Sequence, residues 1–140
     1  MNLHSSVPRP QKRQADMSER TIAWIFRGAA IWGALILTPI YFLETSVAAP
    51  AAHLAAPEYF YGFISAALSF QLVYWTIGGD PQRHRALMPI AVIAKLSFWI
   101  PVVILWALGR TATGTFAFSC GDLFLAVAFF AAWRSGGRRA

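Results

Sequence analysis

Two ionisable residues of opposite charge, Lys95 and Asp122, lie near the middle of consecutive long apolar runs of the sequence. A charged side chain at the centre of a lipid bilayer costs several kcal/mol. Such residues therefore persist mainly where they are paired or where they line a polar interior. Their opposite signs predict that these two side chains form one buried ion pair.

The spacing of the sequence places both residues at a similar depth. Lys95 follows Arg85 by ten residues, which is about 15 Å along a helix that rises ~1.5 Å per residue. Asp122 follows Ala112 by ten residues, approached from the opposite side. Consecutive helices joined by a short loop normally pack together, so we expect the two side chains to meet. Gln71, on the preceding run, is expected to lie close enough to hydrogen-bond to either.

This pair fits two roles. As an interhelical tie, it would fix which faces of the helices meet, because polar groups in lipid need partners. As a site, it would bind or relay a proton, an anion or the polar head of a lipid-soluble molecule. The tie is favoured, since no second intramembrane acid is present to form a relay.

A stripe of small and polar residues recurs at helical spacing along the second apolar run. It consists of Glu58, Gly62, Ser65 and Ser69. Small residues let a second helix approach closely, so the first interpretation is a helix-packing face beside interfacial aromatic residues. In the alternative, Glu58 and Tyr61 mark the outer mouth of a pocket that leads inward to Gln71.

Long apolar helices must position these residues. The sequence is 57% hydrophobic and 13% charged, well below the roughly 25% charged of soluble domains. Each apolar run is close to the ~20 residues that cross a ~30 Å hydrocarbon layer. The runs cover residues 22–43, 59–77, 86–108 and 112–133. The predicted fold is therefore all-α: an integral membrane four-helix bundle spanning residues 21–134, with a disordered tail at 1–20 and a basic tail at 135–140.

Lysine and arginine flank one side of these runs. The first loop, at about residues 44–57, has neither, and the third has only Arg110. The remaining flanking cations are Arg9, Lys12, Arg13, Arg20, Arg83, Arg85, Arg134, Arg138 and Arg139. The positive-inside rule then predicts cytoplasmic termini in a multi-pass protein of the bacterial inner membrane. Arg83, Arg85 and Arg134 are expected at anionic lipid headgroups. Nucleic acid is not an expected partner, because the cations do not share one amphipathic face.

A cleaved signal peptide is the other interpretation of the first run, because Ser46, Ala48 and Ala49 follow it. Its polar leader and its apolar segment are both longer than a signal peptide usually has. The four-helix interpretation is therefore favoured over a three-helix one.

Several kinds of chemistry find no support in the sequence. His4, His53 and His84 fall outside the apolar runs, so a haem held by two intramembrane histidines is not expected. Cys120 is the only cysteine, which excludes an intrachain disulfide and a thiol-based metal site. No glycine-rich phosphate loop, nucleophile elbow or metal-ligand cluster is present. We therefore predict neither a cofactor nor a metal.

Five short motifs resemble those of small four-helix bacterial membrane proteins that are loosely grouped with DoxX-like proteins. They are GluTyrPheTyrGlyPhe at 58–63, AspProGlnArgHisArg at 80–85, Lys95, Gly109-Arg110 and Asp122. The resemblance covers about residues 57–134. It implies a four-helix topology and little chemistry.

The favoured function is an accessory or structural membrane component, acting in a homo-oligomer or a larger membrane complex. The alternative is a small carrier or a lipophile-binding protein for a proton, an anion, or a quinone or lipid head. A membrane enzyme with Lys95 and Asp122 as acid–base groups is the third hypothesis. It is the least favoured, because no second acid or histidine accompanies the pair.

Overall fold

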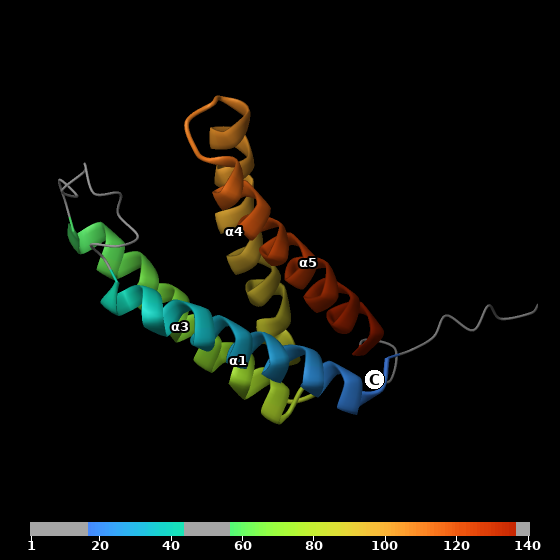
Figure 1. The fold of residues 1–140 in the computed structure, drawn as a ribbon. Helices are drawn as coiled ribbons and strands as arrows, with labels where there is room; N and C mark the ends of the chain where they lie inside the picture. The colour runs from blue at the N-terminus through green and yellow to red at the C-terminus, as the bar shows by residue number, and fades with distance from the viewer. Residues whose placement is uncertain (1–16, 44–56, 137–140) are drawn as a thin grey trace, which may run out of the picture.

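The computed structural model describes residues 17–43 and 57–136, which form four long helices (Figure 1). These are α1 (Glu19–Phe42), α3 (Pro57–Gly79), α4 (Met88–Ala107) and α5 (Thr113–Gly136), with a short 3₁₀ helix, η1 (Arg85–Leu87), before α4. The described part of the chain contains no strand, so the all-helical prediction is confirmed. Most of the predicted N-terminal tail, the first loop and residues 137–140 lie outside the described residues.

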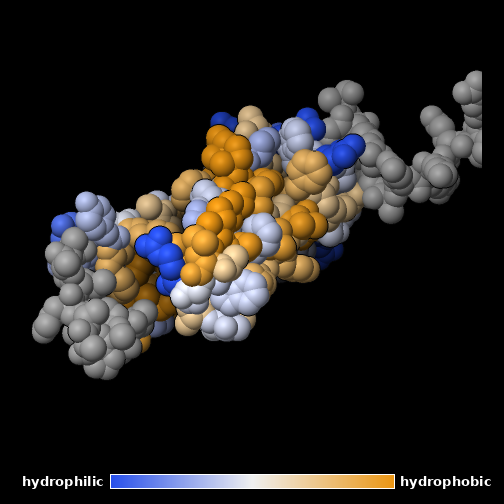
Figure 2. All heavy atoms as spheres, turned by 90° about the horizontal axis from the view of Figure 1, so that it is seen from above, coloured by the Kyte–Doolittle hydropathy of each residue, from blue (hydrophilic) through white to orange (hydrophobic). Residues whose placement is uncertain are grey.

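All four helices are long and apolar enough to cross a membrane. The space-filling view shows hydrophobic side chains over much of one face, with scattered hydrophilic residues (Figure 2). Large apolar side chains such as Leu35, Tyr59 and Phe124 stand exposed on these helices. Exposed apolar surface of this kind suits contact with lipid.

Helices α1 and α5 extend into the predicted tails. Helix α1 begins at Glu19, because the Ser18 side chain caps it by accepting a hydrogen bond from the backbone N–H of Thr21 at 3.1 Å. Helix α5 continues to Gly136. The structure therefore moves residues 19, 20, 135 and 136 from the predicted tails into the helices.

The helices are arranged as two hairpins. Helix α1 packs mainly on α3, and α4 packs mainly on α5. Figure 1 shows that the hairpins meet where α1 and α4 begin and α3 and α5 end, and diverge toward their other ends. We call these the convergent end and the splayed end. The four helices thus form an open V rather than a bundle that is packed along its whole length.

Most of the buried core lies at the convergent end. Phe26 of α1 stacks on Phe129 of α5 with ring centroids 4.3 Å apart, and Tyr74 of α3 packs on the same phenylalanine at 5.0 Å. Small residues, Ala91 and Ala132 among them, fill the rest of this core. Because small side chains let backbones approach closely, they favour tight packing of the hairpins here.

Polar contacts also join the elements at the convergent end. Gln82, in the turn after α3, donates a hydrogen bond to Glu19 Oε1 at 3.0 Å. Arg85 of η1 donates to the backbone carbonyl of Trp133 at 3.3 Å. This bond places a cation near the last turn of α5, where the helix dipole favours positive charge. The convergent end is therefore held by both apolar and polar contacts.

Candidate functional site

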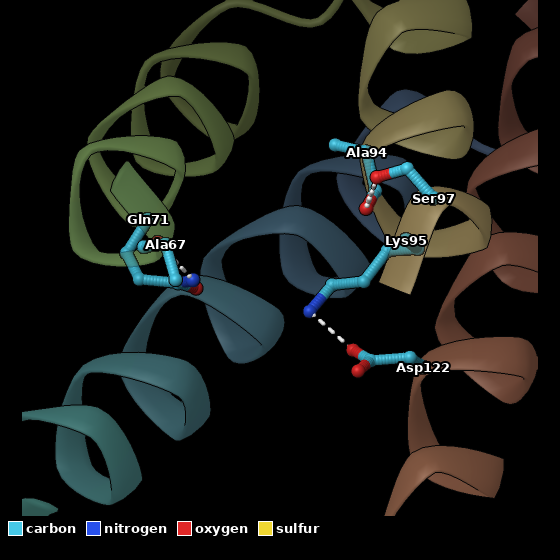
Figure 3. Close-up of polar contacts among 6 residues, drawn as sticks. All are labelled: Ala67, Gln71, Ala94, Lys95, Ser97 and Asp122. Carbon is cyan, nitrogen blue, oxygen red and sulfur yellow. Dashed lines mark hydrogen bonds and ion pairs between the residues drawn. The ribbon is translucent and has the colours of Figure 1, made fainter. Parts of the chain in front are cut away.

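The Lys95 ammonium of α4 donates a hydrogen bond to the Asp122 carboxylate of α5, with Nζ and Oδ1 2.6 Å apart (Figure 3). The side chains are 15% and 17% exposed. The predicted contact between these residues is confirmed. Whether the pair is a tie or a site depends on what lies next to it.

A cavity of about 890 Å³ lies between the two hairpins, and both residues of the ion pair line it. All four helices contribute to the wall, which is predominantly apolar. Its aromatic members include Trp32, Phe63, Phe70, Phe98 and Phe118. Binding sites for small molecules commonly measure about 300–1,000 Å³ and combine apolar walls with a few polar groups. The cavity has both properties.

Tyr74 connects the ion pair to the core. Lys95 Nζ lies 5.6 Å from the centroid of the Tyr74 ring, within cation–π range. The ring also lines the cavity and is 2% exposed. The sequence offered one signal for this residue: Tyr74 follows Gln71 by three positions and therefore shares its helix face. The sequence does not give the rotation of α3 relative to α4, however, so that signal alone does not select Tyr74 over its neighbours.

Gln71 lines the same cavity but does not hydrogen-bond to the ion pair. Its Nε2 donates to the backbone carbonyl of Ala67, one turn earlier in α3, at 2.8 Å (Figure 3). Its Oε1 is buried and has no hydrogen-bond partner among the described residues. The predicted bond from Gln71 to Lys95 or Asp122 is therefore wrong. The amide instead packs beside Gly33 of α1, where the absence of a Cβ leaves room for it.

The predicted pocket mouth is not part of the cavity wall. The Tyr61 ring packs edge-on against Tyr41 of α1, with centroids 5.2 Å apart, and Glu58 is exposed. Neither residue lines the cavity, whereas Phe63, two positions after Tyr61, does. Tyr61 turns toward α1 within its own hairpin, and a pocket mouth at Glu58 and Tyr61 stays a prediction.

The small-residue stripe of α3 faces outward. Glu58, Gly62, Ser65 and Ser69 are all exposed, and the Ser69 hydroxyl donates to the carbonyl of Ser65 at 2.9 Å. Helix α3 instead buries Ile64, Gln71, Tyr74, Ile77 and Gly78. The stripe is therefore not a packing face within the described chain. That another molecule packs a helix against this stripe stays a prediction.

The three arginines expected at lipid headgroups all lie at the convergent end. Arg83 is exposed, and the Arg134 guanidinium carbon lies 5.8 Å from the centroid of the exposed Phe130 ring. Arg85 is half-buried and bonded to Trp133. Arg83 and Arg134 are thus the more accessible of the three.

No three His, Cys, Asp or Glu side chains gather into a metal-binding group within residues 17–43 and 57–136. The polar chemistry of the cavity is that of an ammonium, a carboxylate, an amide, a phenol, a hydroxyl and an indole N–H, supplied by Lys95, Asp122, Gln71, Tyr74, Ser97 and Trp32. These groups suit hydrogen bonding and charge recognition.

No family model, curated protein or solved structure matches the chain. The resemblance to DoxX-like proteins therefore stays a prediction.

Proposed function

We propose that this protein is a multi-pass membrane protein that binds a lipophilic molecule in the cavity between its hairpins. The observation that supports this most is the position of the Lys95–Asp122 pair in the cavity wall. A purely structural contact between α4 and α5 does not need to face a cavity. A site that binds the polar head of a ligand does need to face one.

The composition of the wall agrees with a ligand that is mostly apolar. Aromatic and aliphatic side chains surround the ion pair, and they favour an apolar tail through burial of its surface. The few polar groups would then fix the orientation of the ligand and its specificity. The same wall gives a small ion little to replace its hydration shell, which makes a carrier of such ions less favoured.

We propose that the convergent end faces the cytoplasm of a bacterial cell. The arginines of the described residues support this orientation, because most of them lie at the convergent end. Those at the convergent end are Arg20, Arg27, Arg83, Arg85 and Arg134, whereas Arg110 lies at the splayed end. With this orientation both termini are cytoplasmic by the positive-inside rule, and the hairpins diverge toward the opposite face of the membrane.

An accessory or structural role is the second candidate. The outward stripe on α3, from Glu58 to Ser69, leaves a small-residue face that suits a neighbouring helix in a homo-oligomer or larger complex. In that case the ion pair would serve only to hold α4 against α5.

Two matched glycine substitutions separate these functions. Gly121 and Gly114 both lie on α5, and a Cβ added at either meets nothing within 4 Å. Only Gly121 lines the cavity. We expect Gly121→Leu to reduce the space for a ligand, while Gly114→Leu leaves it unchanged.

The measurement is native mass spectrometry of each variant purified in a mild detergent, with lipid extraction to identify the bound molecules. The wild type and Gly114→Leu should retain a bound lipophile that Gly121→Leu loses, with comparable melting temperatures for all three. The same bound species on all three proteins would contradict ligand binding in the cavity and favour the structural role.

A further inference from the structure

The ion pair retains both a donor and an acceptor. A lysine ammonium has three N–H donors, and among the described residues the ammonium of Lys95 donates only to Asp122 Oδ1. The second carboxylate oxygen of Asp122 accepts no hydrogen bond from them, and Figure 3 shows it outside the dashed contact. Since both side chains line the cavity, a ligand there meets an unused donor beside an unused acceptor.

Neither Ser97 nor Gln71 offers an equivalent pairing. The Ser97 hydroxyl donates to the carbonyl of Ala94 at 2.8 Å, and the Gln71 amide donates to Ala67 (Figure 3). The free acceptor of Gln71, its Oε1, is fully buried beside Gly33. The Tyr74 hydroxyl also lines the cavity but is uncharged. Because hydrogen bonds to charged groups are the stronger ones, the ion pair is the part of the wall best able to hold a polar head.

Charge balance restricts what that head can be. Lys95 and Asp122 are the only acidic or basic residues among those that line the cavity, and their formal charges cancel. A carboxylate or an ammonium head would place an unbalanced charge against a mostly apolar wall, which is costly. A hydroxyl adds none, and it provides one acceptor and one donor on a single oxygen.

The wall beyond the ion pair suits a hydrocarbon tail. Helix α4 carries Phe98 and Leu105 on the wall, and Leu105 lies ten residues past Lys95 toward the splayed end. At ~1.5 Å per residue, about 15 Å of helix α4 extends from the ion pair toward the splayed end. Phe63 of α3 and Phe118 of α5 line the wall from the other sides.

We propose that the ligand is an uncharged lipid alcohol, an inference that rests on the proposed function. Its hydroxyl oxygen accepts a hydrogen bond from Lys95 Nζ, and its hydroxyl hydrogen is donated to the free oxygen of Asp122. Its tail extends along α4 toward the splayed end. The ion pair stays intact throughout.

Four probes built on the same eighteen-carbon oleyl chain, counted with the head carbon, test the head group: oleyl alcohol, oleate, oleylamine and methyl oleate. Their affinities for the full-length protein in detergent are measured by competition with radiolabelled oleyl alcohol. The alcohol should bind about tenfold more tightly than each of the others, because one charge-assisted hydrogen bond corresponds to a factor of about ten or more. Methyl oleate isolates the donor, since it keeps an acceptor and lacks the hydroxyl hydrogen.

Two substitutions check the source of the preference. Asp122→Asn leaves the Lys95 charge unbalanced, so this variant should prefer oleate. Thr76→Ala removes a hydroxyl of α3 that is bonded to the Leu72 carbonyl and does not line the cavity. That variant should keep the wild-type order of affinities. The wild-type ranking alone tests the proposal if Asp122→Asn fails to fold.

The outcomes distinguish this inference from the proposed function. Equal affinities for all four probes, or a wild-type preference for oleate or oleylamine, would overturn the lipid-alcohol head while Gly121→Leu still abolished binding. If no probe binds but Gly121→Leu loses a co-purifying molecule, the head-group inference fails and the cavity function stands. If no probe binds and Gly121→Leu changes nothing, both fail.

Discussion

Gln71 of α3 fills the space that a side chain at Gly33 of α1 would need. A Cβ built on Gly33 overlaps the Gln71 Oε1, with the amide carbon and nitrogen also inside normal contact distance. The amide is held there by its bond to Ala67. Gly33 therefore determines where this polar side chain sits at the edge of the cavity.

We predict that Gly33→Ala displaces the Gln71 amide toward the cavity without unfolding the protein. The overlapping atoms are the end of a flexible side chain, and alanine is favoured over glycine within a helix by about 1 kcal/mol. The free energy of unfolding in detergent should thus change by less than about 1 kcal/mol. Binding in the cavity should weaken, as measured with radiolabelled oleyl alcohol.

Gly28→Ala is the matched control on α1, because an added Cβ there meets nothing within 4 Å. Combining Gly33→Ala with Gln71→Ala should restore binding to the level of Gln71→Ala alone, since the displaced amide is then absent. Weakened binding in the double variant relative to Gln71→Ala would show that Gly33 acts by another route.

The sequence was sufficient to predict depth along a helix but not rotation about its axis. Lys95 and Asp122 were matched by residue counts from the ends of their apolar runs, and they do meet. Gln71 and Tyr61 were placed by the same reasoning, but each turns toward α1 within its own hairpin. A rotation of part of a turn decides such contacts, and weakly amphipathic apolar helices carry little pattern that fixes it.

The divergence of the two hairpins could not be predicted from the sequence either. Apolar residues occur along the full length of each run, so their pattern predicts packing along the full length too. The structure concentrates the core at the convergent end, around Phe26 and Phe129. Which apolar side chains face a helix and which face lipid cannot be distinguished by hydropathy alone, because both environments are apolar.

We predict that Lys95 and Asp122 stabilise the fold jointly. Lys95→Met and Asp122→Leu should each destabilise the protein, because each leaves an unpaired charge in a largely apolar setting. The double variant should be more stable than the sum of the single losses implies. The measurement is a double-mutant cycle scored by thermal unfolding in detergent.

Polar contacts between membrane helices average about 0.6 kcal/mol in such cycles. We therefore expect a coupling of at least about 0.5 kcal/mol. Strict additivity of the two single effects would mean that the pair contributes nothing jointly, and would remove the structural part of its role.

Gly78 is predicted to be required for the packing of α1 on α3. A Cβ at this position would lie 3.0 Å from the Ala23 carbonyl oxygen and 3.0 Å from the Arg27 nitrogen, both backbone atoms of α1. Because backbone cannot move aside cheaply, Gly78→Ala should destabilise the protein by about 1–2 kcal/mol, within the usual range for overpacking.

The neighbouring Gly79→Ala is the control, since an added Cβ there has nothing within 4 Å. It should change stability by less than about 0.5 kcal/mol. Thermal unfolding of the two variants in one detergent provides the comparison. Equal melting temperatures would show that the helices separate at Gly78 at little cost.

The membrane orientation gives the last prediction. Both termini are expected in the cytoplasm, because arginines gather at the end where α1 begins and α5 ends. A reporter that is active only in the cytoplasm should be active when fused after Ala140. Activity of a periplasm-specific reporter at this position would reverse the orientation of every helix.

Single cysteines test the same orientation in the intact chain. Cys120, the only cysteine, is first replaced by serine. A cysteine is then placed at Thr111, between α4 and α5 at the splayed end, or at Gln82, between α3 and η1 at the convergent end. A membrane-impermeant maleimide added to cells with a permeable outer envelope should label Thr111→Cys directly, and Gln82→Cys only after the cytoplasmic membrane is opened. The reverse pattern would place the convergent end outside the cell and turn the splayed end of the cavity toward the cytoplasm.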